Sequence, residues 1–142
     1  MIISSNSLRP FLHRLRGVKI GPGVFIGEEV YLDNEHPESI EIHENAQISI
    51  RAVIVAHTRG PGKVVIGKSA FIGPNCTLVC GAGRSLKIGD GAVVGAGSVV
   101  SRSIPPHLYV TSAGPKPVAR VGVPLPEAQS MESFWAGLTL GC

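Results

Sequence analysis

The sequence is poor in aromatic residues, which make up 5% of the chain, and it has three cysteines, Cys76, Cys80 and Cys142. An odd number of cysteines without a Cys-x-x-Cys pair argues against the disulfide framework of a secreted domain. No apolar run reaches the length of a membrane span, and residues 1–7 are polar rather than signal-like. These absences predict a soluble, cytoplasmic protein with free thiols.

The length and the backbone chemistry limit the possible folds. The chain has 142 residues, enough for one ordinary domain, and we expect residues 1–142 to form a single domain. Eighteen glycines and 11 prolines argue against a helical bundle, because either residue destabilises a helix interior. Hydrophobic residues make up 44% of the chain, so a core of Val, Ile, Leu and Ala is expected.

The charges are unevenly distributed. The net charge of +3 is too small to indicate nucleic-acid binding. Seven of the ten acidic residues lie between positions 28 and 44, whereas residues 91–126 contain none and carry Arg102, Lys116 and Arg120. The acidic part therefore favours cations or hydroxyl groups, and the basic part favours anions such as phosphates.

An internal repeat organises most of the chain. Aliphatic residues recur every six positions in four groups of three, and the spacing widens to ten, twelve and ten between the groups. The twelve residues are Ile20, Ile26 and Leu32; Ile42, Ile48 and Ile54; Ile66, Ile72 and Leu78; and Ile88, Val94 and Val100. A short period of this kind is the signature of a solenoid.

Each hexad is interpreted as one short strand followed by a corner, and three hexads close one triangular coil. The aliphatic residue is expected to point inward, and the glycine that often follows it is expected to let the backbone turn. One coil cannot bury its own inner face, so the coils fold only as a stack and need caps at both ends. The sequence therefore predicts an all-β protein, a parallel β-helix of about four coils, over residues 17–105.

Short helical segments are predicted at both ends of the β-helix. Residues 1–16 form the expected N-terminal cap, and residues 106–142 form a C-terminal extension with a helix that begins near Ser130 as its N-cap. The apolar residues at helical spacing are Leu8, Phe11, Leu12 and Leu15 in the first segment, and Met131, Phe134, Trp135 and Leu138 in the second. Both helices are expected to cover the prism or to contact another subunit.

Four ordered motifs give the chain a resemblance to a known family. They are DNEHPESI at 33–40, IVAH at 54–57, VIGKSAFIG at 65–73, and GAGSVV at 95–100 followed by IPP at 104–106. The chain resembles the hexapeptide-repeat acyltransferases, in particular the maltose, galactoside and polysaccharide O-acetyltransferases. The resemblance implies a left-handed β-helix, a homotrimer, direct transfer from acetyl-CoA as co-substrate to a sugar-like acceptor, and no metal.

His57 is the candidate general base. Acyl transfer requires removal of the acceptor proton, and histidine suits this task because its ordinary pKa is about 6.5. His57 lies in the third hexad of the second coil, directly before the longest insertion. Because Ile54 stacks over Leu32, His57 is expected near Glu35 and within reach of Asp33 and Asn34. In the family a histidine at this place is the general base.

The other candidate residues follow from stacking and from the resemblance. In sugar acetyltransferases an Asp or Asn from this region contacts the acceptor, which implies that role for Asp33 and Asn34. Because Leu78 stacks over Ile54, the backbone at Gly81 is expected to face His57 and to stabilise the oxyanion. Relatives usually have Pro-Gly where this chain has Cys80-Gly81, which also raises the alternative of a Cys80 thiol nucleophile.

The donor site is expected in the basic part of the chain, because coenzyme A carries a pyrophosphate and a 3′-phosphate. The positions that match coenzyme A contacts in relatives are Ala96, Ser101, Arg102, Lys116 and Arg120. The family's Gly-x-Pro-Ala-Lys-Pro segment is shortened to GPKP at 114–117, which displaces Lys116 relative to the pattern.

Other functions are compatible with the same repeat. A γ-type carbonic anhydrase would need three histidines around zinc, and His36, His43 and His57 are not in stacking register. A non-catalytic β-helix that serves as an assembly module is a second alternative. An N-acyltransferase acting on serine or a nucleotide sugar is a third, since amine and hydroxyl acceptors use the same base.

Overall fold

The computed structural model describes residues 5–112 and 117–141, and for residues 5 and 6 it describes the backbone alone. Contacts within the chain divide it into two compact units, Met1–Ser112 and Ala113–Cys142, and each is described by itself. The first unit contains the repeat, and the second contains the C-terminal helix.

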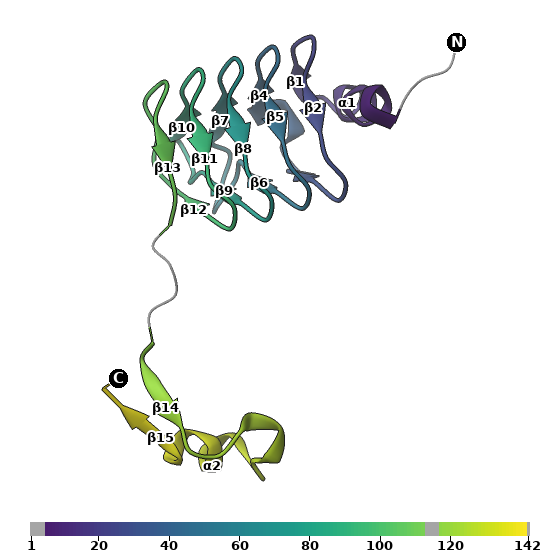
Figure 1. Ribbon diagram of the computed structural model, residues 1–142. Coiled ribbons are helices and arrows are strands. Elements are labelled where there is room, and N and C mark those ends of the chain that lie inside the picture. Colours follow the sequence, from purple (N-terminus) through teal and green to yellow (C-terminus); the bar gives the residue numbers. More distant parts are fainter. Residues whose placement is uncertain (1–4, 113–116, 142) are drawn as a thin grey trace. The chain divides into compact units, whose positions relative to one another are not determined.

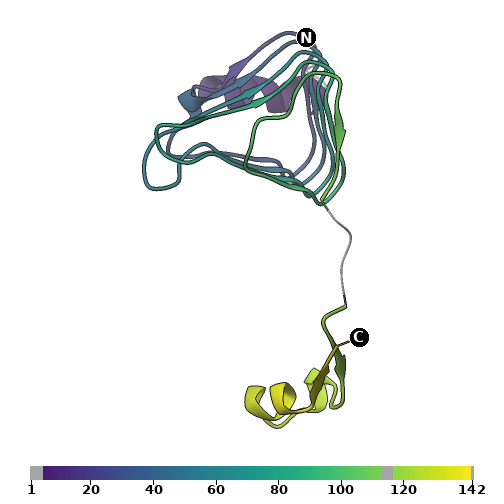
Figure 2. The ribbon, with the colours of Figure 1, turned by 90° about the vertical axis from the view of Figure 1, so that its left-hand side faces the viewer.

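The first unit is a parallel β-solenoid of about four turns, which confirms the predicted fold class (Figures 1 and 2). Successive strands along the chain fall in turn on three walls. The first sheet contains β1 (Lys19–Ile20), β4 (Ile40–Ile42), β7 (Lys63–Ile66) and β10 (Ser85–Ile88). The second contains β2 (Phe25–Ile26), β5 (Gln47–Ile48), β8 (Phe71–Ile72), β11 (Val93–Val94) and β13 (Tyr109–Val110), and the third contains β3 (Tyr31–Leu32), β6 (Val53–Val55), β9 (Thr77–Val79) and β12 (Val99–Val100).

The twelve predicted aliphatic residues form the core of the solenoid. Eleven of them are buried, and Ile20, in the first coil, is partly buried and packs against the others. Each one pairs with its counterpart in the next coil, as Ile26 does with Ile48 and Ile48 with Ile72. The six-residue period therefore places one inward side chain on each wall of every coil.

The glycines that follow the aliphatic residues allow neighbouring coils to approach closely, whereas the sequence predicted that they make the backbone turn. A side chain at Gly27 would place its Cβ 2.7 Å from the backbone nitrogen of Ile50 in the next coil, so glycine is required there for close approach. The left-handed backbone conformation occurs two residues later, for example at Glu29 (φ 54°). The glycine after the aliphatic residue thus allows the coils to stack, and another residue makes the turn.

The N-terminal segment forms helix α1 (Ser5–Leu15), as the spacing predicts. Its C-terminal part is attached to the first coil by arginine side chains: Arg14 donates to the Ile20 and Gly21 carbonyls at 3.0 and 2.9 Å, and Arg16 donates to the Leu32 carbonyl at 2.9 Å. The apolar side chains predicted to cover the prism are 40–70% exposed within this chain; they are Leu8, Phe11, Leu12 and Leu15.

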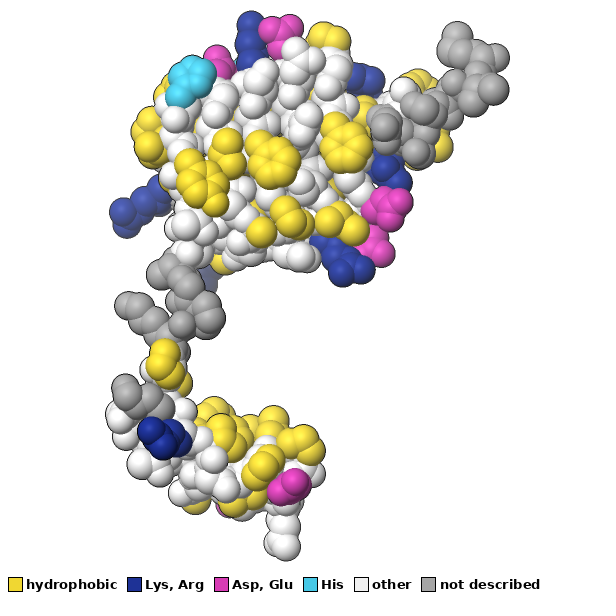
Figure 3. Space-filling model, in the orientation of Figure 1, with side chains coloured by type: hydrophobic (Ala, Val, Ile, Leu, Met, Phe, Trp, Pro, Cys, Tyr) yellow, Lys and Arg dark blue, Asp and Glu magenta, His cyan; other side chains and the backbone are white. Residues whose placement is uncertain are grey.

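The outer face of the second sheet is also apolar. Phe25, Gln47, Phe71, Val93 and Tyr109 are in register across the five strands and alternate with the buried residues. Figure 3 shows hydrophobic side chains gathered over this face of the solenoid. Tyr109 is 67% exposed and Phe25 is 36% exposed.

The second unit is a small α/β element. Strands β14 (Ala119–Val121) and β15 (Leu138–Leu140) form an antiparallel pair, and between them lie the 3₁₀ turn η2 (Leu125–Glu127) and helix α2 (Met131–Ala136). Ser130 is the N-cap, as predicted, and its hydroxyl accepts from the Ser133 N–H at 3.1 Å. Leu138 lies in β15, so its assignment to the helix was wrong: the helix ends at Ala136, before Gly137. Within residues 5–112 and 117–141, no helix has the length and apolar character that crossing a membrane requires.

Candidate active site

One corner of the prism carries most of the predicted site residues. At this corner each coil passes from the third sheet to the first sheet of the next coil, through the loops 33–39, 56–62 and 80–84. A fourth segment, 101–103, leads from β12 to Ile104, which forms an isolated parallel bridge with Ile88 of the first sheet. We call these four segments the corner loops. The first includes the 3₁₀ turn η1 (Pro37–Ser39). Because the strands on either side are in register, the four loops stack along one edge of the solenoid.

Asp33 and His57 form a hydrogen-bonded pair between the first and second corner loops. His57 Nδ1 lies 2.5 Å from Asp33 Oδ2, and the Asp33 side chain is fully buried. The same carboxylate accepts from the backbone N–H groups of Ala56, Glu35 and His36 at 2.8–3.0 Å. Each carboxylate oxygen therefore accepts two hydrogen bonds from donors that the two loops hold in place.

These contacts shift the pKa values of both groups. Burial alone would raise the Asp33 pKa, but the hydrogen bonds from His57 and from the three amides lower it below its ordinary value. The hydrogen bond to Asp33 raises the His57 pKa, and the charges of Asp33 and Glu35 act in the same direction against partial desolvation. Because an ionised carboxylate only accepts, the Nδ1 of His57 carries a proton and its Nε2 is the position that can exchange one.

Glu35 and His36 surround the other side of the imidazole. Glu35 Oε2 lies 3.2 Å from His57 Nε2, and its side chain is 72% exposed. The His36 ring meets the His57 ring edge-on, with the ring centres 5.2 Å apart. The Asp33 carboxylate at Nδ1 and the Glu35 carboxylate at Nε2 both favour the charged imidazolium. For His57 to accept a proton from an acceptor, its Nε2 has to be unprotonated and the Glu35 side chain has to move away from it.

Asp33 and Asn34, the two predicted acceptor contacts, differ in burial and in hydrogen-bond partners. Asn34 is exposed, and its side-chain oxygen accepts from Arg16 Nη1 at 2.8 Å, whereas its NH₂ group has no hydrogen-bond partner among the described residues. Asp33 has no exposed surface, and its oxygens are occupied by the loops and by His57. That burial suits a residue that orients His57 better than one that touches an acceptor.

The third corner loop places Gly81 one coil above His57. Gly81 is partly exposed, and among the described residues no partner accepts a hydrogen bond from its N–H. Cys80 is 3% exposed, and its thiol hydrogen bonds within its own loop, to the carbonyl oxygens of Arg84 at 3.3 Å and Gly81 at 3.7 Å. These contacts favour a structural thiol over a nucleophile.

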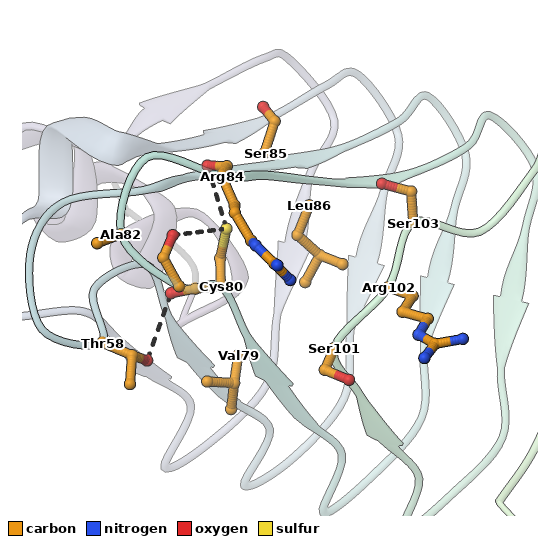
Figure 4. Close-up of a pocket in the computed structure, with 11 residues that line it drawn as sticks. Thr58, Val79, Cys80, Ala82, Arg84, Ser85, Leu86, Ser101, Arg102 and Ser103 are labelled. Atoms are coloured by element: carbon orange, nitrogen blue, oxygen red, sulfur yellow. Dashed lines mark hydrogen bonds between the residues drawn. The ribbon is translucent and has the colours of Figure 1, made fainter.

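An open pocket of about 730 Å³ lies along the same corner (Figure 4). It brings together the predicted residues Gly81, Ser101 and Arg102, and it extends to Thr58, the residue that follows His57. Arg84 also lines the pocket and was not among the predicted residues. The sequence feature that could have identified Arg84 is its position in an insertion that breaks the six-residue spacing.

The remaining predicted donor residues are not at this corner. Ala96 lies in the turn between the second and third sheets, on another edge of the prism. Arg120 lies in β14 of the second unit, and Lys116 is outside the described residues. Their coenzyme A contacts stay predictions.

The histidines considered for a zinc site lie in different environments. His43 is bonded through Nε2 to Glu41 Oε1 at 2.8 Å, beside the first sheet, whereas His36 and His57 are at the corner loops. Among residues 5–112 and 117–141, no group of three or more His, Cys, Asp or Glu side chains is arranged to hold a metal ion.

Comparisons with known proteins point to one family. The family model described as "Hexapeptide repeat of succinyl-transferase" matches residues 63–102. YvoF of Bacillus subtilis (strain 168), provisionally named an acetyltransferase, is 36% identical over 98 residues, which are 66% of this chain and 55% of that protein. A serine acetyltransferase of Mycobacterium tuberculosis is 30% identical over 104 residues, which are 70% of this chain and 44% of that protein. The bifunctional protein GlmU of Syntrophomonas wolfei is 32% identical over 123 residues, which are 81% of this chain and 26% of that protein.

A search of solved structures gave no significant match. The parallel solenoid and these relatives together support assignment of the chain to the hexapeptide-repeat acyltransferase family. The chain spans between about a quarter and just over half of the length of the relatives described above.

Proposed function

We propose that the protein is an acyltransferase that moves an acetyl group from acetyl-CoA to a hydroxyl or amino group of a sugar-like acceptor. The observation that carries the proposal is the hydrogen bond between buried Asp33, in the acidic first loop, and partly exposed His57, which lies at the same corner as an arginine-lined pocket. Two of the relatives bear the name acetyltransferase, and one of these is a serine acetyltransferase.

His57 is the general base of the proposed reaction. Asp33 holds the proton on Nδ1 and so keeps Nε2 directed toward the acceptor. As the acceptor oxygen or nitrogen attacks the thioester carbonyl, its proton moves to Nε2. When the carbon–sulfur bond breaks, the imidazolium returns this proton to the departing thiolate.

The Gly81 N–H is the proposed donor to the carbonyl oxygen. It is one coil from His57, and the negative charge on this oxygen grows as the acceptor attacks. Asn34, with its exposed NH₂ group beside the acidic loop, is the proposed acceptor contact. Asp33 is proposed as a positioning residue that acts through His57, because its side chain has no exposed surface.

We also propose that the protein is a homotrimer. The apolar outer face of the second sheet, which includes Phe25, Phe71 and Tyr109, supports a subunit contact, because an apolar patch on a solenoid wall is stabilised when another subunit covers it.

The experiment that tests the reaction compares His57→Ala with His43→Ala. Thiol release from acetyl-CoA is measured against a panel of sugars, amino sugars and serine. His57→Ala should abolish transfer while the protein stays folded and trimeric. His43 is the matched control, since it is also a histidine bonded to a carboxylate but lies on another part of the prism. An active His57→Ala protein would overturn the proposal.

A further inference from the structure

The first corner loop carries two glutamates, Glu35 and Glu38, whose ion-pair partners are histidines. Glu35 Oε2 lies 3.2 Å from His57 Nε2, and Glu38 Oε1 lies 3.3 Å from His36 Nδ1. Within the described parts of the chain, no lysine or arginine lies within ion-pair distance of either glutamate. The other glutamates that form ion pairs each have a lysine or an arginine: Arg9 for Glu28, Arg51 for Glu29, Lys63 for Glu41 and Lys68 for Glu44. Because a histidine is neutral in part of the physiological pH range, the charge of this loop is not permanently balanced.

Glu35 lies where the acceptor has to arrive. Asp33 occupies Nδ1 of His57, so Nε2 is the ring nitrogen that an acceptor can reach, and the Glu35 carboxylate lies against it. The Glu35 side chain is 72% exposed and can turn into solvent. Its backbone N–H, in contrast, donates to the buried Asp33 carboxylate at 3.0 Å, which keeps the residue beside the base. Glu35 is therefore a movable carboxylate on a fixed backbone.

The charge of Glu35 favours one kind of acceptor. The hydrogen bond to Asp33, and then the charges of Asp33 and Glu35, raise the pKa of His57 and favour the imidazolium, which cannot accept a proton. An uncharged acceptor leaves these effects in place. An ammonium group gives the Glu35 carboxylate a new partner, and its positive charge beside the ring lowers the His57 pKa. An acceptor that carries an ammonium group therefore uncovers Nε2 and also favours the neutral imidazole that acts as a base.

We propose that Glu35 is a specificity-determining residue that selects acceptors carrying an ammonium group. The inference rests on the proposed function, since it takes His57 as the base. A protonated nitrogen has no lone pair, so the ammonium group stays on Glu35 and a neighbouring hydroxyl group of the acceptor attacks the thioester. The proton of that hydroxyl moves to Nε2 and then to the departing thiolate. Amino sugars and smaller amino alcohols have the required arrangement of the two groups.

The first measurement follows ligand binding at His57 without turnover. The pKa of His57 is measured by NMR from its imidazole signals, with and without ligand. Three ligand pairs differ by one amino group: glucosamine and glucose, galactosamine and galactose, and ethanolamine and ethylene glycol. The variant is Glu35→Gln, and the matched control is Glu28→Gln, because the Glu28 side chain is 71% exposed but lies at another corner, between β2 and β3. Melting curves verify that each variant is folded.

The second measurement is kcat/KM for both members of each pair, from thiol release with acetyl-CoA. Glu35→Gln should lower kcat/KM for the ammonium-bearing member about tenfold, the low end for a hydrogen bond to a charged group, because water partly screens an exposed carboxylate. The uncharged member should lose nothing, so the preference for the ammonium group disappears with the charge of Glu35. A structural role of Glu35 would lower both members alike.

In the wild type and in Glu28→Gln, the ammonium-bearing member of at least one pair should lower the His57 pKa and be the better acceptor; Glu35→Gln should show neither effect. If these ligands lower the His57 pKa through Glu35 but no acceptor is acetylated, the ammonium site stands and the proposed transfer reaction fails. If the wild type acetylates both members of every pair equally well, the role of Glu35 is wrong and the proposed function stands. An acetyl group found on the nitrogen would also overturn that role, since this nitrogen could not have stayed charged on Glu35. If no ammonium-bearing ligand changes the His57 pKa, the selection is likewise disproved.

Discussion

Replacing Asp33 by Asn tests the central pair of the candidate site. The substitution keeps the size of the side chain and removes its charge. In the native protein the two carboxylate oxygens accept four hydrogen bonds, from His57 and from the amides of Glu35, His36 and Ala56. An amide side chain has one accepting oxygen, so its NH₂ group must face at least one of these donors.

The size of the effect follows from the burial of Asp33, whose side chain has no exposed surface. At least one buried amide, such as the Ala56 N–H, loses its acceptor, which costs about 1–3 kcal/mol of unfolding free energy. If the asparagine NH₂ group takes the place of Oδ2, it donates to His57 Nδ1, and the proton of the neutral ring then lies on Nε2. Misplacing that proton lowers kcat/KM by about 100-fold or more in sites of this kind.

The pH dependence of stability gives an independent check of the same pair. The folded-state pKa of Asp33 lies below its ordinary value of 3.8, so its contribution is present above that pH and is lost as the pH falls through the folded-state pKa. The folded-state pKa of His57 lies above 6.5, so its contribution is complete below 6.5 and is lost as the pH rises through the folded-state pKa. The stability difference between wild type and Asp33→Asn should be largest between these two values. Urea unfolding from pH 3 to pH 9 measures it.

Glu35→Gln is the matched control, since Glu35 also contacts His57 but is 72% exposed. An exposed ion pair is screened by water, so this variant should unfold close to the wild type. The pH at which activity rises should move downward in Asp33→Asn, because the His57 pKa falls when its carboxylate partner is neutralised. If Asp33→Asn and Glu35→Gln lose equal stability, or if the pH at which activity rises is the same in Asp33→Asn as in the wild type, then Asp33 does not orient His57.

Two further predictions concern the stack and the assembly. Gly27→Ala should lower the unfolding free energy, because the new Cβ would lie 2.7 Å from the Ile50 nitrogen. The control Gly81→Ala should melt near the wild type, because the nearest atom to its new Cβ lies at 3.9 Å. Equal melting temperatures of the two variants would contradict the requirement for glycine at position 27. If the active site of the proposed homotrimer uses residues of two subunits, trimers mixed from His57→Ala and Arg102→Ala chains should regain part of the activity that each variant lacks. Mixed trimers that stay inactive would mean that each site lies within one chain.

The walls of the solenoid could be predicted from the sequence because the repeat determines them. A residue such as Ile48 pairs with Ile26 and Ile72, and one period of six aligns all three. The widened spacings also located the loops, which is why His57 was expected near Asp33 and Glu35. The distances of 2.5 and 3.2 Å agree with that register.

The features that could not be predicted depend on side-chain directions in the loops. Sequence spacing does not tell whether an aspartate after a strand turns inward or outward, so the burial of Asp33 was not foreseen. Arg84 is similar, since its place in the pocket depends on how the five-residue third loop folds over the shorter fourth. The role of the repeat glycines was misjudged because a backbone turn and a close approach both favour glycine.

The pairing pattern also determines how the molecule opens. Every ladder of the solenoid joins neighbouring coils, with partners 16 to 24 positions apart, as in Val93–Tyr109 and Glu41–Val65. No strand pairing of the solenoid bypasses a coil, so separation of an outer coil leaves the inner pairings intact. Amide exchange should therefore be fastest at the two ends of the stack and slowest in the middle. His57 lies in an inner coil, which keeps a paired neighbour on each side until one of the outer coils has detached.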